Sequence, residues 1–195
     1  MPRRPTTLLP ALAIALLAMI AAACGPEGPT EAGGEPADAV ALLTILPSPG
    51  ALRGAPAAPV DEAGLIEALT GSPDPELTTT LEDRRMQSAA VRRWSGPGDQ
   101  ELVAAVSVWE SHLVATGIGG QAAELLQDDG ASAWTPSGLN GSRGARLEDQ
   151  DRTERRLAFA VGPNSLYVRS VGDVDEETLT RAMTRLIRSS GVESG

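Results

Sequence analysis

The sequence has 195 residues, a formal net charge of −10, one cysteine and one histidine, and a chain of this length suits one domain of modest size. All 16 basic residues are arginine, which excludes lysine-dependent chemistry such as phosphate-binding P-loops and Schiff bases. One cysteine and one histidine exclude ordinary zinc and iron–sulfur sites, and the acidic balance argues against nucleic acid as a partner. We therefore expect no metal and no cofactor.

The first 23 residues have the layout of a secretory signal peptide. Arg3 and Arg4 precede an apolar run over 8–20, and three small residues over 21–23 follow it. The apolar run is shorter than the roughly 20 residues that cross a bilayer. We therefore expect residues 1–23 to direct export and then to be removed.

Cys24 follows these small residues directly. The sequence Ala21-Ala22-Ala23-Cys24 resembles the lipobox of bacterial lipoproteins, in which the cysteine thiol is joined to diacylglycerol and becomes the first mature residue. The resemblance covers only the signal and Cys24, and it implies an extracytoplasmic protein anchored to the cell membrane by acyl chains, which hold a protein there almost irreversibly. Lipoboxes usually have leucine in place of Ala21, so cleavage by the ordinary signal peptidase is the alternative.

The chain after Cys24 is predicted to contain a tether, one globular domain and a short tail. Residues 24–37 are rich in Gly, Pro and Glu and have no large apolar side chain, which predicts a flexible, lipid-anchored tether. Residues 38–190 are predicted to form a single domain, and 191–195 a disordered tail. Within the domain, the apolar run 40–46 predicts a strand, and 61–70 predicts a short helix capped by Asp61.

The rest of the domain is predicted to use one strand–strand–helix unit twice. The four strands are predicted over 87–94, 101–109, 156–161 and 165–171. In the two turns a proline presets the first central position, and Gly98 or Asn164 is expected to adopt the positive φ that a type II turn needs next. Apolar residues at helical spacing over 118–126 and 179–187 predict a helix after each pair.

Two such units predict an α+β fold in which an antiparallel sheet carries its helices on one face. The strand 101–109 has apolar residues on both faces, which is typical of a central strand. Asp173 with Glu176 is expected to cap the last helix, because acidic side chains complement the positive end of the helix dipole.

Three residues between 132 and 146 form the candidate binding site for a partner or ligand. Trp134 lies in a predicted loop, where an exposed indole would anchor a partner. Arg143 and Arg146 add positive charge to an otherwise acidic chain, and loops are common binding sites. Burial of Trp134 in the core is the alternative.

No catalytic set is evident in the sequence. His112 is the only histidine, and its sequence neighbours do not make a triad, whose members usually come from separate loops. We interpret it as a structural histidine at the start of a helix. The Asp and Glu clusters are interpreted as solvated surface, with weak calcium binding at Asp149 and Asp151 as the alternative.

Three classes of function remain. The first is a nonenzymatic, lipid-anchored envelope protein whose domain binds a protein partner, because export and tethering are explained and no catalytic set is found. The second is a carrier of a lipid or small ligand, which requires an apolar cavity between sheet and helices. The third is a hydrolase that uses carboxylates alone.

Overall fold

The computed structural model describes residues 38–128, 130–148 and 153–191. The predicted signal peptide, Cys24 and the tether lie outside these residues, as do Asp149, Asp151 and 192–195. The helices are α1 (Ala39–Thr44), α2 (Glu62–Thr70), α3 (Pro75–Glu82), α4 (His112–Asp128) and α5 (Glu176–Ser189). The strands are β1 (Arg53–Gly54), β2 (Ala58–Pro59), β3 (Ser88–Ser95), β4 (Glu101–Val108), β5 (Ser132–Ala133), β6 (Arg143–Glu148), β7 (Thr153–Val161) and β8 (Asn164–Val171).

The strands form one antiparallel sheet in the order β1-β3-β4-β8-β7-β6-β5, and β2 also pairs with β3. The four long predicted strands are confirmed as β3, β4, β7 and β8. The central position predicted for β4 is confirmed as well, because β4 pairs with β3 on one side and β8 on the other. The predicted α+β class with an antiparallel sheet is therefore confirmed.

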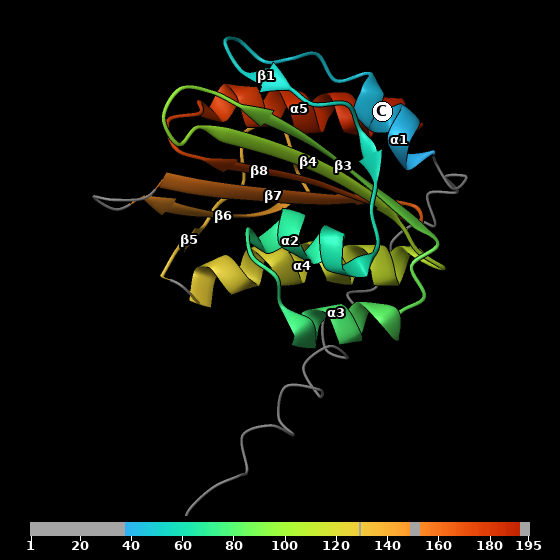
Figure 1. The fold of residues 1–195 in the computed structure, drawn as a ribbon. Helices are drawn as coiled ribbons and strands as arrows, with labels where there is room; N and C mark the ends of the chain where they lie inside the picture. Colours follow the sequence, from blue (N-terminus) through green and yellow to red (C-terminus); the bar gives the residue numbers. More distant parts are fainter. Residues whose placement is uncertain (1–37, 129, 149–152, 192–195) are drawn as a thin grey trace, which may run out of the picture. The chain divides into compact units, whose positions relative to one another are not determined.

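The helices cover both faces of the sheet, so the prediction of a single covered face is wrong (Figure 1). Leu102, Ala104 and Val106 of β4 face a core shared with α1 and α5. Val103 and Ala105, which alternate with them, face a second core shared with α2, α3 and α4. A strand that is apolar on both faces needs a cover on each of them.

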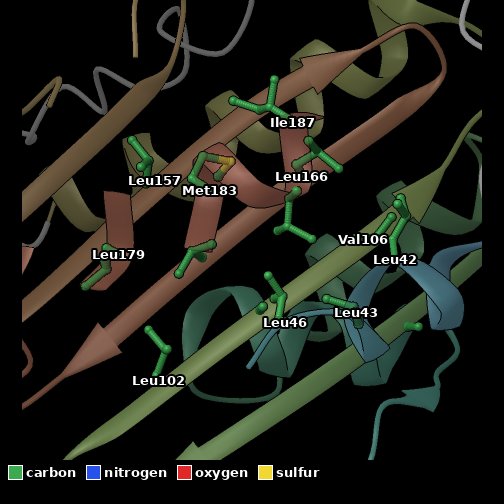
Figure 2. Packing of buried hydrophobic residues seen from close by; sticks show 14 of the residues in the cluster. Leu42, Leu43, Leu46, Leu102, Val106, Leu157, Leu166, Leu179, Met183 and Ile187 are labelled. Atoms are coloured by element: carbon green, nitrogen blue, oxygen red, sulfur yellow. The ribbon is translucent and has the colours of Figure 1, made fainter. Parts of the chain in front are cut away.

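The core on the α1/α5 side is aliphatic. Figure 2 shows Leu179, Met183 and Ile187 of α5 packed with side chains of the sheet, and Leu42 and Leu43 of α1 near Val106. The apolar stripe predicted for the last helix is thus confirmed as its buried face. The helix of the first unit, α4, packs under β6, β7 and β8 on the opposite face.

The segment predicted as a strand over 40–46 is instead the helix α1 with its C-terminal extension. The Asp38 carboxylate accepts hydrogen bonds from the N–H groups of Val40 and Ala41 at 3.0 and 3.1 Å, which starts a helix. Leu42, Leu43 and Leu46 are buried, a spacing that suits one helical face. A short apolar run has no periodicity that distinguishes a buried strand from a buried helix.

The glycine of the β7–β8 hairpin, and not the asparagine, has the positive φ. Gly162 has φ +52, and Val161 pairs directly with Asn164 across the turn. This is a two-residue hairpin with glycine first, which matches the strand twist better than a type II turn does. In the β3–β4 turn, the positive φ predicted for Gly98 is confirmed at +67.

The cap of α5 is Asp175 and not Asp173. Its carboxylate accepts hydrogen bonds from the Thr178 N–H at 2.7 Å and from the Thr178 hydroxyl at 2.9 Å. Glu176 and Glu177 supply the acidic first turn. The α2 cap predicted at Asp61 is confirmed, because its carboxylate accepts from the Gly64 N–H at 2.9 Å.

Replacing Asp175 by alanine is expected to lower the free energy of unfolding by about 1 kcal/mol at neutral pH, because α5 loses its cap. Although partial burial opposes ionisation, hydrogen bonds from Thr178 lower the pKa of the Asp175 carboxyl below its ordinary value. The carboxylate therefore stabilises the fold fully above the unfolded-state pKa of about 3.9, and this stabilisation is lost as pH falls through the lower folded-state pKa.

Urea unfolding at neutral pH and at about pH 2 measures this difference, which should shrink in acid. Asp175→Asn keeps a capping oxygen but removes the charge, so at neutral pH its loss should be smaller than that of Asp175→Ala. An equal loss for Asp175→Ala at both pH values would show that the charge of the cap contributes nothing.

Candidate functional site

The three residues singled out in the sequence do not share one surface. Trp134 is half-buried and packs against the core on the α1/α5 side. Arg143 lies beside α4, where its Nη1 is 3.8 Å from a carboxylate oxygen of Glu124. Arg146 projects from the other face of β6, because strand residues an odd number apart point to opposite faces. The structure therefore separates Arg143 from Trp134 and Arg146.

His112 lies at the start of α4 and contacts the turn between β7 and β8. Its Nδ1 is 3.1 Å from the Gly162 carbonyl oxygen, and its Nε2 is 3.4 Å from the Thr116 hydroxyl. The nearby Ser107 hydroxyl accepts a hydrogen bond from the Trp109 indole at 2.9 Å. The contact with Gly162 links the start of α4 to the β7–β8 turn and supports the interpretation of His112 as a structural histidine.

The described residues contain neither a cluster of metal ligands nor a helix suited to span a membrane. No three or more His, Cys, Asp or Glu side chains there are grouped so as to hold a metal ion. None of the helices in the described ranges combines the length and the apolar character that crossing a bilayer requires.

A buried ionic cluster lies between the sheet and the C-terminal end of α2. The Glu154 carboxylate, fully buried, accepts a hydrogen bond from Arg156 Nε at 2.6 Å. Arg156 also donates to the Thr70 carbonyl at 2.9 Å, and the Tyr167 hydroxyl donates to the Leu69 carbonyl at 2.6 Å. Burial raises the pKa of the Tyr167 hydroxyl, so it keeps its proton and remains a donor. The cluster closes the carbonyl end of α2 and has a structural role.

A groove on the opposite face, between α5 and the segment 46–50, is the candidate functional site. Its floor is Trp94 of β3 and Leu102 of β4, and its α5 wall consists of Thr178, Arg181, Ala182 and Arg185. We call it the arginine groove. Its volume is about 240 Å³, slightly below the roughly 300–1,000 Å³ of typical ligand pockets.

The charged side chains that line the arginine groove are both arginines, and no carboxylate lines it among the described residues. Arg181 is 68% exposed, and its Nε is 3.7 Å from a carboxylate oxygen of Glu177, which is 77% exposed. Such a pair between exposed side chains is weak. Within the described ranges Arg185 forms no ion pair. The groove is therefore a positive patch on an acidic chain.

The outer wall of the groove is held in place by Arg92. Its Nη1 donates to the carbonyls of Leu43, Thr44 and Leu46 at 2.7 to 3.1 Å, and its Nε donates to the Ala55 carbonyl at 3.0 Å. These carbonyls include the free ones at the end of α1, where a cation is favoured. The guanidinium also stacks on Trp94, with its Cζ 4.9 Å from the ring centroid.

Close packing at Gly54 brings β1 onto Trp94. A Cβ atom at Gly54 would collide with Trp94 Nε1 and would lie 3.2 Å from Ser48 Oγ. The indole of Trp94 is 1% exposed, and its Nε1 has no hydrogen-bond partner in the described part of the chain. Trp94 therefore carries a buried N–H that has no acceptor among the described residues.

A second groove, of about 280 Å³, lies between α2 and the segment 55–60. Its charged side chains are Glu67 and Arg93, and these pair with each other at 3.4 Å. Because Glu67 and Arg93 already pair with each other, the charged groups of this groove are less available to a ligand than those of the arginine groove.

Sequence patterns do not single out Arg181 and Arg185. The apolar stripe of α5 is the visible signal, and the two arginines lie beside that stripe, where charged residues are ordinary. Their spacing of four places both on one side of a helix, which is the one clue the sequence holds. Trp94 and Leu102 enter the site only through the pairing of β3 with β4.

No protein-family model matches the sequence, and no curated protein matches it. The fold is similar to the crystal structure of the extracellular domain of PknH from Mycobacterium tuberculosis, with a TM-score of 0.58. The match covers 83% of this chain and 100% of that chain, at 10% sequence identity. At this identity the likeness shows the fold alone, a mixed α+β fold that the two chains share.

Proposed function

We propose that the chain is a bacterial envelope lipoprotein whose domain, residues 38–190, binds a small ligand in the arginine groove and catalyses no reaction. The observation that carries this proposal is the groove itself, which has two arginines on its α5 wall and an apolar floor. Ligand pockets are mostly apolar concavities with a few polar groups that fix orientation, and the arginine groove has this composition.

Among the functions considered from the sequence, the geometry favours the small-ligand carrier. That class requires an apolar cavity between the sheet and a helix, and the arginine groove lies there. Recognition of a protein partner through Trp134, Arg143 and Arg146 is less favoured, because Arg143 lies on the other face of β6. A hydrolase would need two carboxylates at the site, and none lines the groove in the described residues.

The proposed location outside the cytoplasm rests on two observations. The resemblance of Ala21–Cys24 to a lipobox supports an acyl anchor on Cys24, and the fold is similar to that of an extracellular domain. In this arrangement residues 24–37 form a tether to the membrane and 38–190 bind the ligand outside it.

Changing Cys24 to alanine is expected to move the protein from the membrane fraction to the soluble fraction of its host, because the acyl anchor is lost. Native mass spectrometry of the released full chain should then show a bound species of defined mass. Ala182→Trp, which fills the groove, should abolish that species. Arg188→Trp, on an exposed part of the same helix, is the matched control and should retain it.

The acyl anchor and ligand binding in the groove can each be contradicted separately. Retention of the Cys24→Ala chain at the membrane would contradict the anchor. A bare chain without any bound species, or a species that persists in Ala182→Trp, would contradict binding in the groove. Circular dichroism of both tryptophan variants shows whether they remain folded.

A further inference from the structure

We infer that the ligand of the arginine groove is a small amphiphilic anion, with a phosphate or carboxylate head held between Arg181 and Arg185 and a short apolar tail on the floor. This inference rests on the proposed function and names the chemical class of its ligand. It is carried by three properties of the groove: its charge, its donor groups and its size.

The charge of the groove selects an anion. Arg181 and Arg185 are one helical turn apart and line the same groove, so both guanidinium groups reach one ligand. A guanidinium presents planar, paired donors that match phosphate and carboxylate oxygens. In the described part of the chain, the ion pair of Arg181 with Glu177 is long and exposed, so an incoming anion displaces only a weak interaction.

The other polar side chains that line the groove are Ser48, Trp94 and Thr178. The indole N–H of Trp94 donates and cannot accept, and a buried donor without a partner is unfavourable by about 1–3 kcal/mol. The Ser48 hydroxyl lies close by, across Gly54. The Thr178 hydroxyl already donates to Asp175. Of these, the Ser48 hydroxyl is the donor available to a ligand oxygen, because the Trp94 N–H is buried and the Thr178 hydroxyl is engaged by Asp175.

The floor and the size of the groove require an apolar part of limited length. Leu46, Leu102 and Ala182 contribute aliphatic surface beside the arginines, and burying such surface is favourable. A volume of about 240 Å³ equals that of about eight water molecules at roughly 30 Å³ each. A head group with a short chain fits this space, whereas a lipid with two long acyl chains does not.

The test is a calorimetric titration of the full chain carrying Cys24→Ala, below micelle-forming concentrations. Octyl phosphate is expected to bind at one site. Octyl glucoside, which has the same tail without charge, and inorganic phosphate, which has the charge without a tail, are each expected to bind about tenfold more weakly or worse, as the loss of a charged hydrogen bond or of buried tail would cause.

Variants of α5 locate the site. The double change Arg181→Gln with Arg185→Gln should weaken octyl phosphate binding by about tenfold or more. Both side chains are at the groove rim, so the fold should persist. Arg188→Gln removes one charge from the same helix at a residue that does not line the groove, and it should weaken binding much less than the double change does.

Three outcomes would overturn the inference. In the first, octyl glucoside binds as tightly as octyl phosphate and Ala182→Trp blocks the binding of both. The groove would then bind a ligand without recognising its charge, so the proposed function would stand and the anionic class would not. If the double glutamine variant binds octyl phosphate normally, the arginines are not the anion site. If the chain binds phosphatidylglycerol vesicles but not octyl phosphate, the source of the anion is a membrane surface and the groove holds no free amphiphile.

Failure of this inference and failure of the proposed function are distinguishable. The titrations use purified chain and defined ligands, whereas native mass spectrometry asks whether any host molecule occupies the groove. A bound host species that is uncharged would retain the proposed function and overturn the anionic class.

Discussion

Replacing Glu154 by glutamine is expected to lower the free energy of unfolding by about 3–5 kcal/mol, because it removes the carboxylate charge that faces the buried Arg156 guanidinium. Glu154 is fully buried and Arg156 is 3% exposed. Their 2.6 Å hydrogen bond lies beneath the end of α2, where water cannot replace it. Glutamine has nearly the same shape as glutamate, so the loss of stability measures the effect of the charge and not of packing.

Urea unfolding measures this loss through the midpoint at constant slope. The matched control is Glu124→Gln, which breaks the exposed pair with Arg143 at 3.8 Å and should change stability by less than about 1 kcal/mol. The double change Glu154→Leu with Arg156→Met removes both charges and should recover part of the loss. A Glu154→Gln effect as small as that of the control would contradict a buried, interdependent pair.

Replacing Trp94 by alanine is expected to lower the free energy of unfolding by about 3–5 kcal/mol, the range for large aromatic residues in a core. Trp94 is 1% exposed and packs in the core on the α1/α5 side. It also supports Arg92, which in turn holds the carbonyl end of α1. Loss of the ring therefore creates a cavity and loosens the segment that walls the arginine groove.

Trp94→Phe is the control for this change. Phenylalanine keeps an aromatic ring for Arg92 and removes the indole N–H that has no partner in the described residues, so its loss should be well below that of alanine. Thermal and urea unfolding of the two variants give the comparison. Equal losses for phenylalanine and alanine would show that the indole edge, and not the ring volume, carries the stability.

Local patterns predict most of the elements. The strands β3, β4, β7 and β8 follow from alternating or continuous apolar runs between turn residues, and α5 follows from an apolar stripe at helical spacing. The cap at Asp61 is also local, because a capping side chain reaches only the next few N–H groups. These features depend on residues near one another in sequence, which is why a sequence shows them.

Long-range packing decides the features that the sequence misses. The run 40–46 becomes helical because Asp38 caps it and because its leucines pack on a sheet formed by strands far along the chain. The cap of α5 falls at Asp175 and not at Asp173, since the path of the chain leaving β8 sets where the helix begins. Both outcomes depend on contacts that no local window contains.

The sequence by itself determined the central antiparallel strands, the amphipathic last helix and the acidic, lysine-free composition that excludes several chemistries. Only the tertiary structure decided that helices cover both faces and that residues 46–50, Trp94, Leu102 and α5 meet in one groove. The reason is physical: periodicity reports which side of an element is apolar, but not which partner covers it. A groove built from parts of the chain that are far apart in sequence exists only once those parts are packed together.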